Sequence, residues 1–178
     1  MFAYDIRVKL NEFSPDTWRD LIIPENYTFK DLLDIINMIW GFSGDEDSLF
    51  ILRPSHDVIM DASKSNDFNV KYDAGTTEVN VLFDDIIDLV YLYDMKDRWQ
   101  IGIQINAKID YDKDYATVVA FKGAFNPLEK CGGVWELSEI IYYANNPSKR
   151  DSSKNAKLSL KVKKFNITQT NEKLKNFK

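Results

Sequence analysis

The sequence predicts an α+β fold, in which a twisted, mostly antiparallel sheet is covered by two main helices. The first observation is an alternation of period two, clearest where Trp99, Ile101 and Ile103 alternate with polar residues, which is typical of a strand with one buried face. The second is the helical spacing of apolar residues in two other segments, Phe29–Trp40 and Trp135–Ala144. Strands and helices that each bury one face pack together in layers.

The first half of the chain follows a β-grasp-like order of hairpin, helix and strand. Strands are expected at Tyr4–Leu10 and Thr17–Ile23, joined through a Ser14–Asp16 turn, with a third strand at Leu49–Leu52. The helix Phe29–Trp40 lies between them. Thr28 is placed to cap its start and Gly41 to end it.

Residues 55–78 are polar and weakly patterned, and only short extended pieces are expected there, at Val58–Met60 and Phe68–Tyr72. One short helix is expected within Val79–Ile87. The central feature of the chain is a hairpin, in which strands Val90–Tyr93 and Trp99–Asn106 are joined by the polar turn Asp94–Arg98. A further strand is expected at Thr117–Phe121, followed by a loop over residues 123–133.

The C-terminal part of the chain is basic. Residues 149–178 contain ten Lys or Arg and two acids, whereas the whole chain has a net charge of −5. Leu158, Leu160 and Val162 alternate and predict a strand, and a terminal helix is expected from Thr170. These apolar residues favour a C-terminal segment 149–178 that docks on the domain over a free arm that binds nucleic acid.

The composition predicts a single domain over residues 1–178. A hydrophobic content of 44% suits a folded core, and the one cysteine, Cys131, suits a reducing compartment. No apolar run approaches the roughly 20 residues that span a bilayer. We therefore expect a cytoplasmic protein with no membrane contact and no cofactor, whose oligomeric state the sequence leaves open.

Five blocks of the sequence together resemble the plasmid pRiA4b ORF-3-like protein family. They are Ser14–Arg19 with Ile23-Pro24, Thr28–Gly41, Tyr93–Trp99 beside the family's YDFGDxW, Pro127–Gly133 beside its PPEDxGG, and Phe165–Asn171 beside its FDxxxxN. The likeness spans nearly the whole chain. It departs where the family's signature glycine is Lys96, where an acid is Lys130, and where its two usual histidines fall at Ser48 and near Ile101. The resemblance implies an intracellular α+β domain and carries no biochemical activity, although family members are often associated with mobile elements.

Asp94, Asp97 and Glu129 have two interpretations. If the two signature loops lie side by side, the three carboxylates could hold a hard cation such as Mg²⁺, as a metal-dependent hydrolase or nuclease would require. The local interpretation, which we favour, is that Asp94 and Asp97 cap the hairpin turn and pair with Lys96 or Arg98.

The remaining candidates point to binding more than to catalysis. Cys131 could be a nucleophile, but His56 is the only histidine and no spacing links the two. Trp40 and Trp99 fall on apolar faces and are expected in the core, whereas Trp18 and Trp135 could rim a groove. The sequence therefore favours a non-catalytic binding module for a protein or nucleic-acid partner. Its candidate surface consists of Trp18, Arg19, Asp94, Asp97, Arg98, Glu129 and Trp135.

Overall fold

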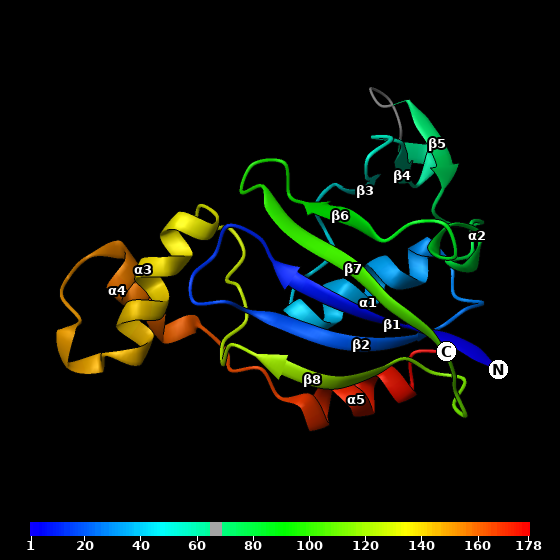
Figure 1. The fold of residues 1–178 in the computed structure, drawn as a ribbon. Helices are drawn as coiled ribbons and strands as arrows, with labels where there is room; N and C mark the ends of the chain where they lie inside the picture. The colour runs from blue at the N-terminus through cyan, green and yellow to red at the C-terminus, as the bar shows by residue number, and fades with distance from the viewer. Residues whose placement is uncertain (65–68) are drawn as a thin grey trace.

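The computed structural model describes residues 1–64 and 69–178 and contains one eight-stranded sheet (Figure 1). Its strands are β1 Phe2–Leu10, β2 Trp18–Pro24, β3 Ser48–Leu52, β4 Val58–Met60, β5 Val70–Asp73, β6 Asp88–Tyr93, β7 Trp99–Asp110 and β8 Thr117–Lys122. The α-helices are α1 Phe29–Trp40, α2 Asn80–Phe83, α3 Val134–Asn145, α4 Lys154–Leu158 and α5 Ile167–Lys175. Short 3₁₀ turns are η1 Ala62–Lys64, η2 Pro147–Lys149 and η3 Ser159–Lys161.

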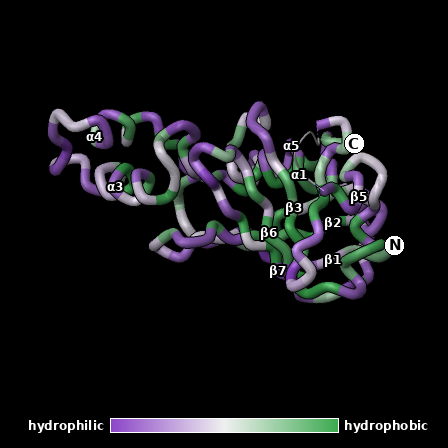
Figure 2. Tube along the Cα trace, turned by 90° about the horizontal axis from the view of Figure 1, so that it is seen from above, coloured by the Kyte–Doolittle hydropathy of each residue, from purple (hydrophilic) through white to green (hydrophobic). Residues whose placement is uncertain are grey.

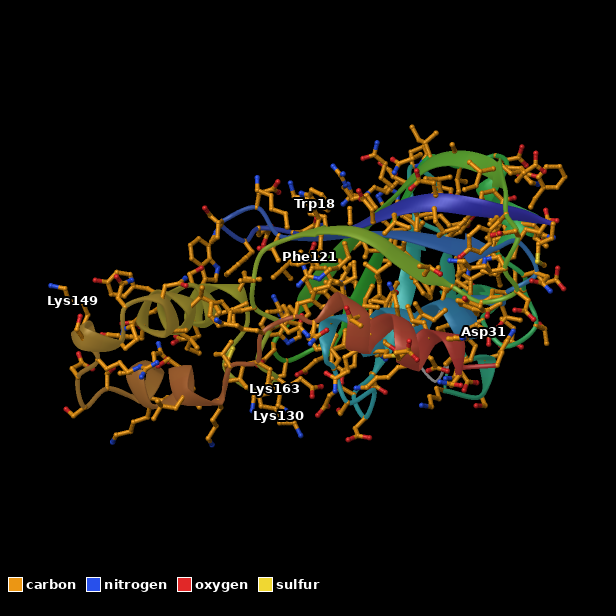
Figure 3. The ribbon with its side chains drawn as sticks, turned by 90° about the horizontal axis from the view of Figure 1, so that it is seen from below. Trp18, Asp31, Phe121, Lys130, Lys149 and Lys163 are labelled. Carbon is orange, nitrogen blue, oxygen red and sulfur yellow. The ribbon has the colours of Figure 1, made fainter. Side chains whose placement is uncertain are left out.

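The strand order in the sheet is β5-β4-β3-β6-β7-β1-β2-β8. Neighbouring strands run antiparallel except β4 and β5, which are parallel. Helices α1 and α5 both lie under the same face of the sheet, as the view from below shows (Figure 3). The predicted α+β class with a mostly antiparallel sheet is confirmed, and β6 and β7 separate β3 from the first hairpin.

Helix α1 forms because its sequence satisfies both ends. The Thr28 hydroxyl accepts a hydrogen bond from the Asp31 N–H, and the Asp31 carboxylate accepts one from the Thr28 N–H, which together make a capping box. Gly41 ends the helix in the left-handed conformation, with φ of 75°. The helix then places its apolar face on the sheet, with Trp40 fully buried.

The core lies between the sheet and α1. Ile6, Tyr91, Trp99 and Ile101 are completely buried, and Ile103 is 1% exposed. Figure 2 shows that hydrophobic stretches gather in the strands, while α3 and α4 extend from one end of the molecule. The predicted inward face of the central hairpin, and the core positions of Trp40 and Trp99, are confirmed.

The middle of the chain agrees with the predicted elements. Strand β4 has the expected bounds, and α2 falls within the segment where one short helix was expected. Strand β5 begins at Val70, whereas the expected piece began at Phe68, which lies outside the described residues.

The predicted strand at Leu158–Val162 is wrong. Residues of this segment belong to α4 and η3, and Leu160 is 70% exposed. The Ser153 side chain accepts a hydrogen bond from the Ala156 N–H and so caps α4, which starts a helix before the alternating residues can extend. The terminal helix also begins earlier than predicted, at Ile167, because Asn166 caps it through the Gln169 N–H.

The end of the chain lies against β8, the edge strand. The Asn171 side-chain amide accepts from the Val118 N–H at 2.8 Å and donates to the Val118 carbonyl at 2.9 Å, so it pairs with the strand as a neighbouring strand would. Leu174 is fully buried and Phe165 nearly so. This segment therefore contributes to the same core as the sheet.

None of the helices formed by residues 1–64 and 69–178 combines the length and apolarity needed to cross a membrane.

Candidate functional site

Two loops meet at the base of α3. One is the β6–β7 turn Asp94–Arg98, and the other is the segment Pro127–Gly133, which we call the glycine loop. The Gly132 N–H donates to Asp97 Oδ2 at 3.2 Å. A Cβ at Gly133, where φ is 86°, would lie 2.5 Å from the Asp97 carbonyl oxygen. Only glycine permits this approach, so the two loops lie directly against each other.

Asp94 holds the turn in shape. It is 5% exposed, and its Oδ1 accepts hydrogen bonds from the N–H groups of Lys96 at 2.9 Å and Asp97 at 3.4 Å. Both Asp94 and Arg98 adopt positive φ, near 57° and 55°. Asp94 therefore caps the hairpin turn, as one part of the local interpretation expected. Within the part of the chain that the structure describes, neither aspartate forms an ion pair with the side chain of Lys96 or Arg98.

Glu129 faces the loop that follows α1. Its Oε1 accepts hydrogen bonds from the Tyr93 hydroxyl and from Ser43 Oγ, and its Oε2 accepts from the Ser43 N–H at 3.0 Å. Burial and the neighbouring Glu129 carboxylate raise the pKa of Tyr93. Glu129 therefore ties the glycine loop to residue 43 and does not face Asp94 and Asp97 across an open site.

The described residues contain no group of three His, Cys, Asp or Glu side chains that could hold a metal ion. Asp94, Asp97 and Glu129 do not form such a group, and each of them accepts hydrogen bonds from other groups of the protein. The geometry that the metal-dependent alternative requires is not formed here.

An open cleft of about 330 Å³ lies where the two loops and α4 meet. It is lined by Glu46, Asp94, Lys96, Asp97, Lys130, Cys131, Gly132 and Lys154. Lys130 pairs with Glu46 at 3.3 Å, and main-chain N–H groups satisfy oxygens of both aspartates. Lys96 and Lys154 have no ion-pair partner among residues 1–64 and 69–178, and neither do Asp94 and Asp97, whose carboxylates accept hydrogen bonds from main-chain N–H groups.

Cys131 is not placed as a nucleophile. It is buried, its thiol contacts the Gly133 carbonyl oxygen at 3.6 Å, and burial raises its pKa to about 11. A thiol with so high a pKa contains very little thiolate at neutral pH. His56 lies in the turn between β3 and β4.

Arg19 is not a surface residue, which corrects its place in the candidate surface. Its side chain is completely buried, with the guanidinium 4.0 Å from the ring centroid of Phe165 and 4.7 Å from that of Trp40. It donates to the carbonyl oxygens of Trp18 and Lys122 and to Asn126 Oδ1. Burial lowers its pKa to about 10. Arg19 joins β2 and β8 to the C-terminal segment.

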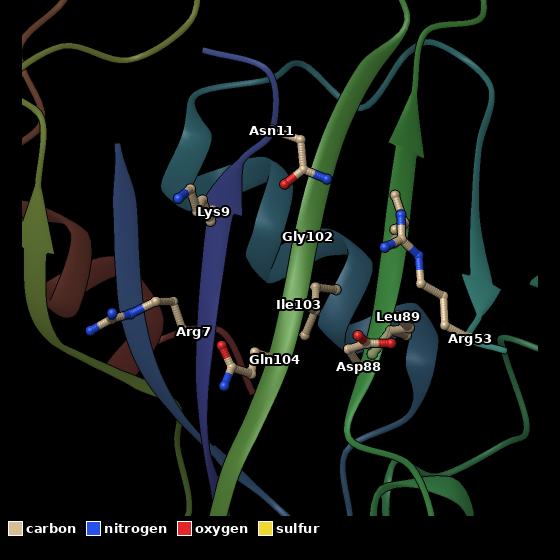
Figure 4. Close-up of a pocket in the computed structure, with 10 residues that line it drawn as sticks. Arg7, Lys9, Asn11, Arg53, Asp88, Leu89, Gly102, Ile103 and Gln104 are labelled. Atoms are coloured by element: carbon tan, nitrogen blue, oxygen red, sulfur yellow. The ribbon is translucent and has the colours of Figure 1, made fainter. Parts of the chain in front are cut away.

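Trp18 lies on the opposite, open face of the sheet. Its ring lies 3.9 Å from the Arg7 guanidinium, which also pairs with Asp20 through two hydrogen bonds. A second hollow of about 200 Å³ occupies this face around Gly102, as Figure 4 shows. The cations Arg7 and Lys9 that line it already pair with Asp20 and Asp16.

Trp135 and Arg98 complete the candidate set. Trp135 is 81% exposed in the first turn of α3, two residues beyond Gly133. Arg98 is exposed, and its main-chain N–H donates to the Asp94 carbonyl oxygen. The structure thus gathers Asp94, Asp97 and Trp135 at one end and separates them from Trp18 and Arg19.

The sequence did not predict that Glu46, Lys130 and Lys154 line the cleft. Lys154 reaches the cleft because α4 folds beside α3, and the sequence pattern predicted no helix over Lys154–Leu158. The one available signal was Ser153, which is a favoured helix N-cap residue.

Fold and site together define an α+β protein built on one mostly antiparallel sheet, with two loops in contact beside helix α3. The model of the plasmid pRiA4b ORF-3-like protein family matches residues 2–173, and the chain belongs to this family. The crystal structure of MM3350, a protein of unknown function from Methanosarcina mazei Go1, is similar, with a TM-score of 0.71, 21% identity and 89% of each chain covered. That likeness shows the fold. No curated protein matches the chain.

Proposed function

We propose that this protein is a non-catalytic binding module, which holds an anionic group of a protein or nucleic-acid partner in the cleft between the two loops. One observation carries the proposal: Lys96 and Lys154 line this cleft without an ion-pair partner in the described structure, while Asp94 and Asp97 each direct a carboxylate oxygen at a main-chain N–H and Glu46 pairs with Lys130. An anion that enters the cleft would meet two free ammonium groups, and charge-assisted hydrogen bonds to them are the stronger kind.

The acidic side chains of the cleft are held in place by other groups of the protein. Asp94 and Asp97 direct oxygens at N–H groups of the two loops, and Glu46 pairs with Lys130. Gly133 is the N-cap residue of α3 and provides no side-chain cap, and the dipole of the helix adds positive potential at this end.

Catalysis has less support than binding. A general base must reach its substrate, and a metal site must gather its ligands, yet the Asp94, Asp97 and Glu129 carboxylates serve the loops that hold them. Cys131 is buried, and burial raises the pKa of its thiol to about 11. We also propose a cytoplasmic location, which the single cysteine favours.

The test is a titration of the ¹⁵N-labelled protein with pyrophosphate, followed by NMR. The amides of Lys96, Gly132 and Lys154 should shift, and Lys96→Glu should abolish the shifts. The control is Lys173→Glu, which makes the same charge change on α5, where Lys173 has no ion-pair partner in the described structure. Shifts that are absent, or equally weak in both variants, would contradict the proposal.

A calorimetric titration with Mg²⁺ or Mn²⁺ tests the alternative of a metal-dependent hydrolase or nuclease. We expect no binding at millimolar metal. Binding that disappears in Asp97→Asn would overturn the non-catalytic assignment.

A further inference from the structure

The helical end of the molecule has a charge opposite to that of the rest. Residues 134–164 contain seven of the 23 basic residues and three of the 28 acidic residues, a net charge of +4, which leaves −9 for the remainder. This stretch, which we call the helical unit, comprises α3, η2, α4 and η3 and extends from one end of the sheet (Figure 1). Figure 3 shows Lys149 at its far end and Lys163 close to the body.

The positive charge of the helical unit is not neutralised from within. Its six lysines are exposed, and none has an ion-pair partner in the described structure: Lys149, Lys154, Lys157, Lys161, Lys163 and Lys164. Several lysines elsewhere in the chain do form ion pairs with acidic side chains: Lys9, Lys30, Lys71, Lys108 and Lys122. The unit's three acids are occupied, because Glu136 and Glu139 bind Asn155 at 2.6 Å and Asp151 accepts from Tyr143.

Helix α3 also leaves an aromatic face uncovered. Glu136 and Glu139 face Asn155 of α4, and Tyr143 faces Asp151 in the segment before α4. Leu137 and Ile141 line an apolar hollow against the body. The remaining face presents Trp135, which is 81% exposed, and Tyr142, which is 50% exposed. They lie seven residues apart, about 10 Å along the axis, since a helix rises about 1.5 Å per residue.

We propose that the helical unit binds single-stranded nucleic acid, with phosphates against its lysines and bases stacked on Trp135 and Tyr142. Exposed aromatic side chains beside unpaired cations are the combination that binds single strands without sequence preference. A duplex keeps its bases stacked on one another, so it offers the aromatic face nothing comparable. This inference rests on the proposed function, because it names the partner whose phosphate enters the cleft, and Lys154 belongs to both surfaces.

The charge arrangement favours a flexible polyanion over a folded acidic partner. Six lysines spread over residues 149–164 match the regular charge of a phosphodiester chain, and the acidic remainder of the protein would confine the strand to this end. An acidic peptide or an anionic membrane surface would use the same charges, and both are separate outcomes of the test.

The experiment measures fluorescence anisotropy of a labelled 15-nucleotide oligothymidylate with the full chain. Binding should weaken steeply as salt rises. The double variant Lys157→Glu/Lys161→Glu should lose at least about tenfold in affinity, because two lysines that face phosphates are reversed. Its matched control is Lys173→Glu/Lys175→Glu, which reverses two last-turn lysines of α5 and should change affinity less than about threefold.

A second variant tests stacking. Trp135→Ala/Tyr142→Ala leaves every charge in place and should weaken binding at least about tenfold, since each stacked base contributes substantially. Trp40 and Trp99 are fully buried, and Trp18 lies on the open face of the sheet under the Arg7 guanidinium, so quenching of tryptophan fluorescence by the oligonucleotide should disappear largely with Trp135. A hairpin duplex of equal charge should bind more weakly than the single strand.

Four results would overturn the inference: no binding at low salt, an equal loss in the α5 control, binding that ignores the aromatic variant, or stronger binding to polyglutamate or to phosphatidylserine vesicles than to the oligonucleotide. The proposed function fails separately. If Lys96→Glu leaves oligonucleotide binding unchanged, the cleft has no role while the helical unit keeps its own. If pyrophosphate shifts the cleft amides but the oligonucleotide does not bind, the proposed function of the cleft stands and the nucleic-acid inference fails.

Discussion

The helical unit, residues 134–164, differs from the rest of the chain, which contains the sheet and which we call the body, in how its aromatic and charged side chains are used. In the body, an arginine is fully buried among aromatic rings, and lysines such as Lys9 and Lys108 pair with acids. In the helical unit, Trp135 and Tyr142 face water, and the lysines lack ion-pair partners in the described structure. Burial and pairing stabilise a fold, whereas exposed aromatics and free charges contribute little to stability and much to association. The proposed function therefore assigns the contact with a partner to the helical unit and the cleft beside it.

Arg19 and Trp135 differ most in exposure, although both were assigned to one candidate surface from the sequence. Arg19 is 0% exposed and its guanidinium donates three hydrogen bonds, while Trp135 is 81% exposed. Stability and binding should therefore respond to different substitutions, in an order that can be measured.

The largest effect is expected from Ile103→Asp in the body. An uncompensated carboxylate on the buried sheet face costs several kcal/mol, against a total stability of about 5–15 kcal/mol. The variant should be unfolded or close to it by circular dichroism. Gln104→Asp, one residue along β7 on the exposed face, is the control and should melt close to the parent. Similar melting of the two variants would show that the inward face is wrongly assigned.

A smaller but clear effect is expected from Arg19→Met. The substitution keeps much of the apolar volume but leaves the Trp18 and Lys122 carbonyl oxygens without their donor, which should destabilise the fold by about 3 kcal/mol. Arg53→Met is the control, because Arg53 is exposed and has no ion-pair partner in the described structure. Urea denaturation measures both, and equal midpoints would contradict the structural role of Arg19.

The smallest effect on stability is expected from Trp135→Ala. A side chain that is 81% exposed loses little on truncation, so stability should change by no more than about 0.5 kcal/mol. Trp99→Ala, at a fully buried tryptophan, should cost about 3–5 kcal/mol. A large loss in Trp135→Ala would mean that α3 packs this residue and does not present it to a partner.

Local sequence signals predicted the elements that depend on neighbours in the chain. Thr28 and Asp31 cap α1 by themselves, and the alternation through Ile103 marks the buried face of β7 without reference to other strands. The strand predicted at Leu158–Val162 failed because its alternation is as compatible with the exposed helix and turn that Ser153 begins.

The candidate site was less predictable because its geometry depends on distant contacts. Arg19 is buried because aromatic rings distant in the sequence, those of Trp40, Phe121 and Phe165, pack against its guanidinium. Glu129 turns away from the aspartates because Ser43 and Tyr93 offer it three donors. No spacing in the sequence indicates either arrangement. The contact between the two signature loops was a condition of one interpretation of the sequence, and the structure contains it.

The most direct test of the division between body and helical unit is an amide-resolved NMR titration with a 12-nucleotide oligothymidylate. We predict shifts at Lys96, Gly132 and Lys154, along α3 and α4, and at the Trp135 indole, with the open sheet face unchanged. Shifts centred instead on Arg7, Lys9 and Arg53 around the sheet hollow, with the helical unit unmoved, would contradict the account.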